Sequence, residues 1–169
     1  MALVLNTNSY VELADADEYF DTRIDSAAWF DASDEVKEQA LVTATQLIDN
    51  HAWIGAAVSS SQALAWPRKN AVYWDSRLGM QVSIEEDAVP NLVKVAVYEQ
   101  SLHLVNNEDL LAGTTQTFES ISVGSISLSD SNSDVTRTSI KPSVAMKPIR
   151  PLIRRGSAGG MGSAWWRSN

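Results

Sequence analysis

The sequence predicts a mainly α-helical fold with a β-hairpin and an extended C-terminal arm. Two long segments, residues 34–50 and the segment that follows Pro90, have the apolar periodicity of buried helices. Short segments that alternate between apolar and polar residues lie on both sides of Gly124, which favours a β-hairpin. Residues 136–169 are basic and rich in proline and glycine, a composition typical of an extended arm.

The charge of the chain is divided in the same way. Residues 1–135 contain 21 acidic and 6 basic residues, a net charge of −15, whereas residues 136–169 contain 7 basic residues and no acidic one. A chain of 169 residues is long enough for one domain with an appendage. We therefore expect an acidic domain over 1–135 that folds without the arm. The basic arm over 136–169 is expected to reach an acidic surface of a partner protein, a neighbouring copy or nucleic acid.

Three helices are expected in the acidic domain. The first is short and covers residues 13–23, where apolar side chains recur at helical spacing. The second covers residues 34–50, begins after a serine suited to the N-cap, and has one apolar stripe, which indicates core packing. The third begins at Pro90, a favourable first helical residue, and ends near residues 106–107 or at Gly113. Because the third helix is apolar on nearly all sides, it is expected to be buried on most of them.

The connection between the second and third helices carries several aromatic residues among Gly, Pro and Ser. Ser59 and Gln62 have the spacing of a capping box, which predicts a helical turn over residues 62–65. Two short alternating segments within residues 72–84 predict a small hairpin with Gly79 near its turn. A connection of this length is often a contact surface.

Two further elements are expected after the third helix. Residues 117–123 and 125–128 predict a β-hairpin, or one strand that is bulged at Gly124. In the arm, three prolines each follow a basic residue, and this pattern predicts an extended path. Fully extended, residues 136–169 would span roughly 110 Å at about 3.3 Å per residue.

Catalysis is not expected. The chain has no cysteine, and the common nucleophile, phosphate-binding and metalloprotease motifs are absent. His51 lies on the apolar stripe of the second helix, where a core histidine is the expected role. The acids at 85–87 are adjacent rather than spaced as metal ligands, and the glycines within 159–162 lack the lysine and helix of a phosphate loop. We expect no enzyme activity, no cofactor and no metal. With no signal peptide or membrane span recognisable, a soluble protein is expected.

The arm combines basic residues with large apolar ones. Solvated tails rarely carry so much apolar surface. Arginine and aromatic residues are the usual anchors of protein interfaces, and they also bind single-stranded nucleic acid by stacking and phosphate pairing. The residues alone do not decide whether the partner of the arm is a protein or single-stranded nucleic acid. The expected contact residues of the arm are Arg150, Arg154, Arg155, Trp165, Trp166 and Arg167.

Several stretches of the acidic domain together match a family pattern. They are Ser9–Phe20, Trp29, Ala40–Asp49, Trp53–Gly55, Gln62–Arg68 and Val89–Ala96. The most distinctive is Gln62–Arg68, with the sequence Gln-Ala-Leu-Ala-Trp-Pro-Arg. These stretches resemble tailed-phage head–tail connector (adaptor) proteins, including the set often labelled DnaT-like single-stranded-DNA-binding. The resemblance covers about residues 9–128 and leaves out the arm.

The resemblance implies a small antiparallel helical bundle with a β-hairpin, in a structural protein of the virion. Copies would form a ring, commonly a dodecamer, between the portal protein and the tail or neck protein below it. The ring would seal the capsid vertex and let DNA pass through its lumen without specific binding. An acidic wall suits that passage, because the phosphates meet no cations. The expected localisation is the neck of a bacteriophage virion, after synthesis in the host cytoplasm.

The same resemblance implies two contact surfaces. The arm would dock on the portal through its basic and tryptophan residues, and neighbouring copies would touch through the aromatic connection and the third helix. The expected inter-subunit contacts are Trp53, Trp66, Arg68, Tyr73 and Trp74. The alternative is an accessory protein that binds single-stranded DNA through the basic aromatic tail.

Overall fold

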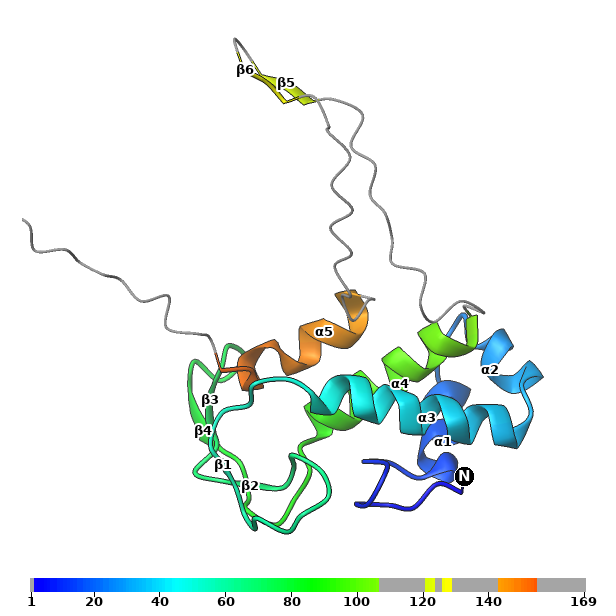
Figure 1. Cartoon of the computed structure of the whole chain (residues 1–169), viewed down its shortest axis with the longest axis horizontal. Helices are drawn as coiled ribbons and strands as arrows, with labels where there is room; N and C mark the ends of the chain where they lie inside the picture. Colours follow the sequence, from blue (N-terminus) through cyan, green and yellow to red (C-terminus); the bar gives the residue numbers. More distant parts are fainter. Residues whose placement is uncertain (1, 107–120, 124–125, 129–142, 155–169) are drawn as a thin grey trace, which may run out of the picture.

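The computed structural model describes residues 2–106, 121–123, 126–128 and 143–154 (Figure 1). The helices in these ranges are α1 (Leu13–Asp21), α2 (Ala27–Asp31), α3 (Asp34–Asp49), α4 (Asn91–Asn106), α5 (Ser143–Ile149) and the 3₁₀-helix η1 (Arg150–Leu152). The strands form three antiparallel pairs: β1 (Ala56–Ala57) with β2 (Arg68–Lys69), β3 (Val72–Asp75) with β4 (Met80–Ser83), and β5 (Ile121–Val123) with β6 (Ile126–Leu128). The described residues thus combine helices with small hairpin sheets.

Helix α4 is the centre of the domain. It packs against α3, α5 and α2, which surround it in Figure 1. The packing on several sides explains why its apolar residues are not confined to one stripe. It also confirms the prediction of a helix buried on most sides, with buried residues that include the polar Glu99, Gln100 and Ser101. None of the described helices is long and apolar enough to span a membrane.

The core forms where α1, α2, α3 and α4 meet the loop segments. Phe20 and Trp29 lie with their ring centroids 4.6 Å apart, and Tyr19 stacks on Tyr98 at 4.7 Å. The first contact joins α1 to α2 and the second joins α1 to α4. Each ring buries a large apolar area, which stabilises the packing of these helices. The large side chains that are essentially inaccessible include Trp29, Trp66, Tyr10, Phe20, Leu41, Ile48, Ile149 and Leu152.

The predicted extended path of the arm is wrong for residues 143–154. These residues form α5 and η1, and α5 packs on α4. Ala145, Ile149 and Leu152 are completely buried. Their spacing of i, i+4 and i+7 is that of a helical apolar face. Residues 143–154 therefore belong to the folded domain, and the predicted boundary at residue 135 does not separate domain from arm.

The prolines of this segment explain the error. Pro148 lies inside the last turn of α5 and Pro151 lies in η1. Such residues favour an extended path in a free chain, but they are tolerated here because α5 is short and ends directly after Pro148. The apolar face packed on α4 then outweighs the local preference. Residues 136–142 and 155–169 lie outside the described residues.

The hairpin predicted within residues 72–84 is confirmed as β3–β4, in the register Tyr73 to Val82, with Gly79 in its turn at a φ of +64°. The predicted helical turn over residues 62–65 is wrong. Gln62 instead donates from its amide nitrogen to the carbonyl oxygens of Leu64 and Pro67, at 2.6 and 3.2 Å. These bonds hold the segment as a bend.

The hairpin near Gly124 is confirmed over its described part. β5 pairs with β6 in the antiparallel register Val123 to Ile126, which excludes the alternative of a single bulged strand. Residues 117–120 of the predicted hairpin lie outside the described ranges. Helix α2 and the short pair β1–β2 had no counterpart among the predicted elements.

Gly55 and Gly79 offer a matched test of a close backbone approach. Both have positive φ angles, which strain any residue with a side chain. A Cβ at Gly55 would lie 2.6 Å from the carbonyl oxygen of Lys69, whereas a Cβ at Gly79 meets no atom within 4 Å. We expect Gly79→Ala to lower the free energy of unfolding by about 1 kcal/mol through backbone strain, and Gly55→Ala to lower it by more, because β2 must move away. Urea denaturation measures both, and equal losses would contradict the close approach.

Candidate nucleic-acid interface

Acidic and basic residues gather at opposite ends of the domain. Residues 12–38, which form α1, α2 and the start of α3, contain 10 acidic and 2 basic residues and are called the acidic end here. Residues 52–83 and 143–154 contain 6 basic residues and one acidic residue, and three acids follow directly at 85–87. These ranges hold the β1–β4 hairpins, α5 and η1, and they are called the hairpin end. Figure 1 places β1 to β4 and η1 at one end and α2 at the other.

Both cations of the acidic end are already paired. The ammonium nitrogen of Lys37 lies 3.2 Å from Asp17 and 3.7 Å from Asp34. Arg23 forms an ion pair with Glu99 of α4. The remaining carboxylates give this end a negative field, which repels a phosphate backbone.

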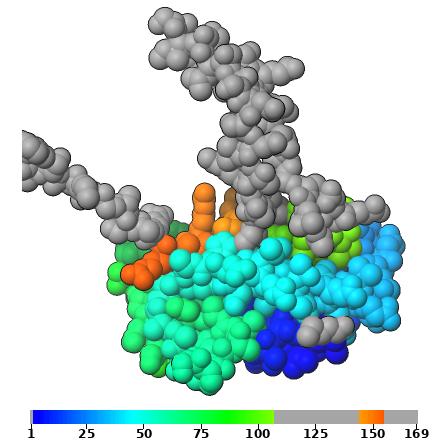
Figure 2. All heavy atoms as spheres, in the orientation of Figure 1, coloured from blue at the N-terminus to red at the C-terminus, as the bar shows by residue number. Residues whose placement is uncertain are grey.

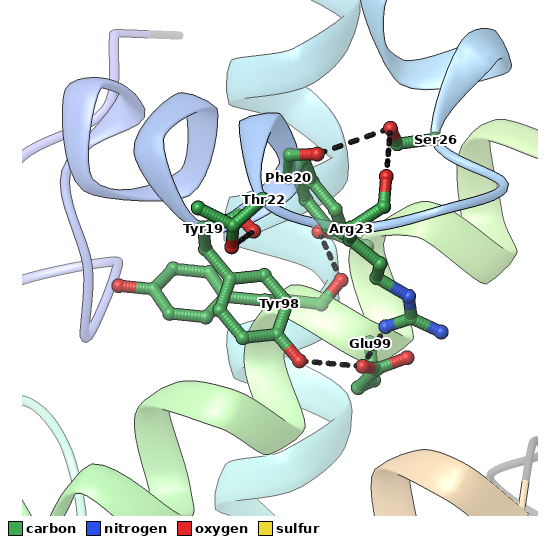
Figure 3. Close-up of polar contacts among 8 residues, drawn as sticks. Tyr19, Phe20, Thr22, Arg23, Ser26, Tyr98 and Glu99 are labelled. Carbon is green, nitrogen blue, oxygen red and sulfur yellow. Dashed lines mark hydrogen bonds and ion pairs between the residues drawn. The ribbon is translucent and has the colours of Figure 1, made fainter.

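The Arg23–Glu99 pair belongs to a buried polar cluster (Figure 3). The Tyr19 hydroxyl donates a 2.6 Å hydrogen bond to the same carboxylate oxygen that Arg23 contacts. The Ser26 hydroxyl lies 3.0 Å from the Phe20 carbonyl oxygen, which closes the end of α1. Burial raises the pKa of the Tyr19 hydroxyl, and the charge of Arg23 opposes that rise. The cluster fixes α1 to α4 and contains no activated nucleophile.

At the hairpin end, Lys147, Arg150 and Arg154 are exposed. Among the described residues, no carboxylate forms an ion pair with them. The backbone at Arg154 is held firmly, because the amide of Arg154 donates to the Ala52 carbonyl at 2.6 Å and the amide of Ile54 donates to the Leu152 carbonyl at 3.0 Å. In Figure 2 the α5–η1 segment (orange) lies at the surface of the domain. Of the predicted arm contacts, Arg150 and Arg154 are thus placed on the domain, while Arg155, Trp165, Trp166 and Arg167 lie outside the described residues.

Of the predicted inter-subunit residues, some are buried in the chain's own core and others are exposed. Trp53 and Trp66 are 5% and 1% exposed, so they pack in the core of their own chain, and the prediction that they contact a neighbour is wrong. Arg68 is half-buried and donates to the carbonyl oxygens of Ile54, Ala65 and Gly55 at 2.7 to 3.1 Å. These bonds tie the loops of the hairpin end together. Tyr73 is half-buried, and Trp74 is 59% exposed.

The distinctive stretch at residues 62–68 has a structural role that its sequence did not disclose. The amide of Trp66 donates to the Tyr10 hydroxyl oxygen at 3.1 Å, and the amide of Ala65 donates to the Asp49 carboxylate at 2.8 Å. The Tyr10 hydroxyl itself donates to Asp49. Burial, followed by this hydrogen bond, raises the pKa of Tyr10 far above its ordinary value. The network fastens the loop to α3 and to the N-terminal segment.

The remaining polar candidates also have structural surroundings. His51 is half-buried, with Nδ1 2.9 Å from the Ile48 carbonyl oxygen and its ring next to Trp53. Glu86 accepts a 3.3 Å hydrogen bond from the amide of Asn70. Within the described ranges, no three His, Cys, Asp or Glu side chains are grouped as metal ligands. The exposed cations of the hairpin end are therefore the best candidate for a functional site.

Comparison with known proteins gives one family. Residues 2–167 match the family described as "Putative DnaT-like ssDNA binding protein". No curated protein and no solved structure shows significant similarity to the chain.

Proposed function

The chain belongs to this DnaT-like family, and from that premise we propose that it binds single-stranded DNA through its basic C-terminal segment. The observation that carries the proposal is the set of exposed cations at Lys147, Arg150 and Arg154, which lack carboxylate partners among the described residues. Each cation that contacts a phosphate releases a counterion from the strand, which favours binding at low salt. The arm contributes further contacts through Arg155, Trp165, Trp166 and Arg167, as cations and stacking indoles do in other single-strand binders.

The fixed position of these cations gives the strand a defined route. The acidic end repels phosphates, so the strand is confined to the hairpin end of the domain. Because the backbone of residues 152–154 is bonded to residues 52–54, the chain at Arg154 loses little backbone freedom on binding. A short strand therefore enters along α5 and η1 and continues over the arm.

We expect the neutral variants Lys147→Gln, Arg150→Gln and Arg154→Gln to weaken binding of a single-stranded oligonucleotide one step at a time. Each lost phosphate contact is expected to make the negative slope of log affinity against log salt shallower by about 0.7. The triple variant is expected to make it shallower by about 2. Fluorescence anisotropy with a labelled oligonucleotide measures both affinity and slope.

Lys94→Gln is the matched control for this series. Lys94 lines the same surface cavity as Asp87 and is far from the three cations in the sequence. Its neutralisation is expected to leave the slope unchanged. A triple variant with the slope of the unmodified protein would overturn the assignment of these cations.

A second candidate function is the ring adaptor between a portal protein and a tail protein. It is favoured by the acidic end, whose exposed apolar residues Ile24 and Phe30 are suited to a protein contact. In this function the arm docks on the portal, and DNA passes an acidic wall without binding. Mass measurement of the purified protein, alone and with a portal protein, tests it. A dodecamer-sized ring on the portal supports the adaptor, and a monomer in both samples contradicts it.

A further inference from the structure

Trp74 differs from the other tryptophans that the structure describes. Trp29, Trp53 and Trp66 are buried in the core, whereas Trp74 is 59% exposed. The alternation of strand β3 explains the difference. Tyr73 packs against the core and Asp75 is buried, so the opposite face of the strand points outward with Trp74. The cross-strand neighbour of Trp74 is Gln81, which is also exposed.

The turn of the β3–β4 hairpin holds this face in place. Asp75 accepts hydrogen bonds from the Arg77 amide at 2.8 Å and from the Arg77 guanidinium at 3.0 Å. Its own carbonyl oxygen accepts from the Gly79 amide at 2.8 Å. The hydrogen bonds from Arg77 hold the pKa of Asp75 below its ordinary value, so the turn keeps these contacts at neutral pH and loses them in acid. Trp74 is thus presented by a fixed hairpin.

Elements that neighbour this hairpin carry basic residues. Strand β3 packs against η1, which begins with Arg150, and Arg154 follows two residues after η1 ends. Lys69 of β2 is exposed. Asp75 is already bonded to Arg77, and Glu86, which follows β4, is bonded to the amide of Asn70. An exposed indole on a hairpin whose neighbouring elements carry exposed cations offers the two groups that bind a nucleic-acid strand: a base stacks on the ring and the flanking phosphates meet the cations.

We propose that the outer face of the β3–β4 hairpin is a stacking platform on which Trp74 takes one base of a single strand, while Arg150 and Arg154 bind the adjacent phosphates. The inference rests on the proposed function and adds to it the residue that distinguishes single strands from duplexes. In a duplex both faces of a base are covered by its neighbours, so no face is free for Trp74. The cations attract both forms of DNA, and the indole adds affinity for the single strand alone.

The test compares Trp74→Ala, Trp74→Phe and Leu78→Ala in the full chain. Leu78 is the matched control, because it lies in the same hairpin and is 61% exposed. Trp74→Ala is expected to weaken binding of a single-stranded oligonucleotide by about tenfold or more, with the salt slope and the affinity for the duplex of the same sequence unchanged. Trp74→Phe is expected to retain most of the affinity, and Leu78→Ala all of it. Thermal unfolding of each variant checks that the hairpin change leaves the domain folded.

The outcomes separate this inference from the proposed function. If the unmodified protein binds the strand and Trp74→Ala binds it equally well, the platform is wrong and the binding by the cations stands. If single-strand and duplex affinities fall together, Trp74 does not discriminate between them and the inference is overturned. If Trp74→Ala changes the oligomeric state of the free protein and leaves strand binding unchanged, this face is a contact between copies and the inference is overturned. If the unmodified protein binds no strand at low salt, the proposed function itself fails.

Discussion

A chain that ends at residue 142 is expected to lose most of its stability, whereas a chain that ends at residue 154 is expected to fold like the full protein. The difference is the segment α5–η1, which buries Ala145, Ile149 and Leu152 completely against the domain. Truncation of one buried isoleucine or leucine to alanine costs about 2–5 kcal/mol. A domain is stable by about 5–15 kcal/mol in all. Removal of the whole segment therefore takes away most of that stability.

Single substitutions in α5 test the same claim without changing the chain length. We expect Ile149→Ala to lower the free energy of unfolding by about 2–5 kcal/mol. Val144 lies on the same helix but is 44% exposed, so Val144→Ala is the matched control and should cost far less. Urea denaturation followed by circular dichroism compares these variants and the two truncated chains. Equal midpoints for the chains ending at 142 and 154 would show that α5 does not belong to the core.

Loss of Arg23 is the second large effect that we expect. Glu99 is 5% exposed, and its carboxylate is held by Arg23 and by the Tyr19 hydroxyl. Arg23→Ala leaves this charge buried with one hydrogen bond, which costs up to about 3–5 kcal/mol for a fully buried pair. Because the Arg23 side chain is 30% exposed, solvent screens part of that cost, and we expect about 2–3 kcal/mol.

A partner substitution distinguishes the buried charge from simple loss of packing. In the double variant Arg23→Met and Glu99→Leu, both charges are replaced by apolar groups, and most of the lost stability is expected to return. Arg77→Ala is the comparison: Arg77 is 84% exposed, and the buried Asp75 keeps the hydrogen bond from the backbone amide of residue 77, so a smaller loss is expected. Thermal denaturation at neutral pH measures all of these variants. If the double variant is as unstable as Arg23→Ala, the charge pair is not the cause.

The long helices could be predicted from the sequence because their signals are local. The end of α3 at Asp49 and the start of α4 after Pro90 follow from an apolar stripe and a favourable proline. The helix α5 could not be predicted in this way, because its apolar face is short and two prolines pointed to an extended chain. That face is recognisable as a core element only when the surface of α4 that receives it is known.

The candidate site was predictable in its charge but not in its geometry. The division into acidic and basic parts is visible in the sequence, yet the docking of the cations at 147–154 beside the hairpins depends on bonds to residues 52–54. Sequence does not distinguish Trp74 from Trp53 or Trp66, since all three stand in the same aromatic connection. The burial of one face of β3 makes the difference. The Tyr19–Glu99 contact joins residues 80 positions apart, and no local pattern indicates it.

The affinity of the full chain for a labelled single-stranded oligonucleotide, measured from low to moderate salt, tests the central claim most directly. The proposed binding by the basic segment predicts measurable affinity at low salt. It also predicts that log affinity falls with log salt with a slope of about −2 or steeper, because each of the three described cations contributes about −0.7. The chain that ends at residue 154 should keep part of this affinity, because Lys147, Arg150 and Arg154 remain. Absence of binding by the full chain at low salt, or binding that does not depend on salt, would contradict the claim.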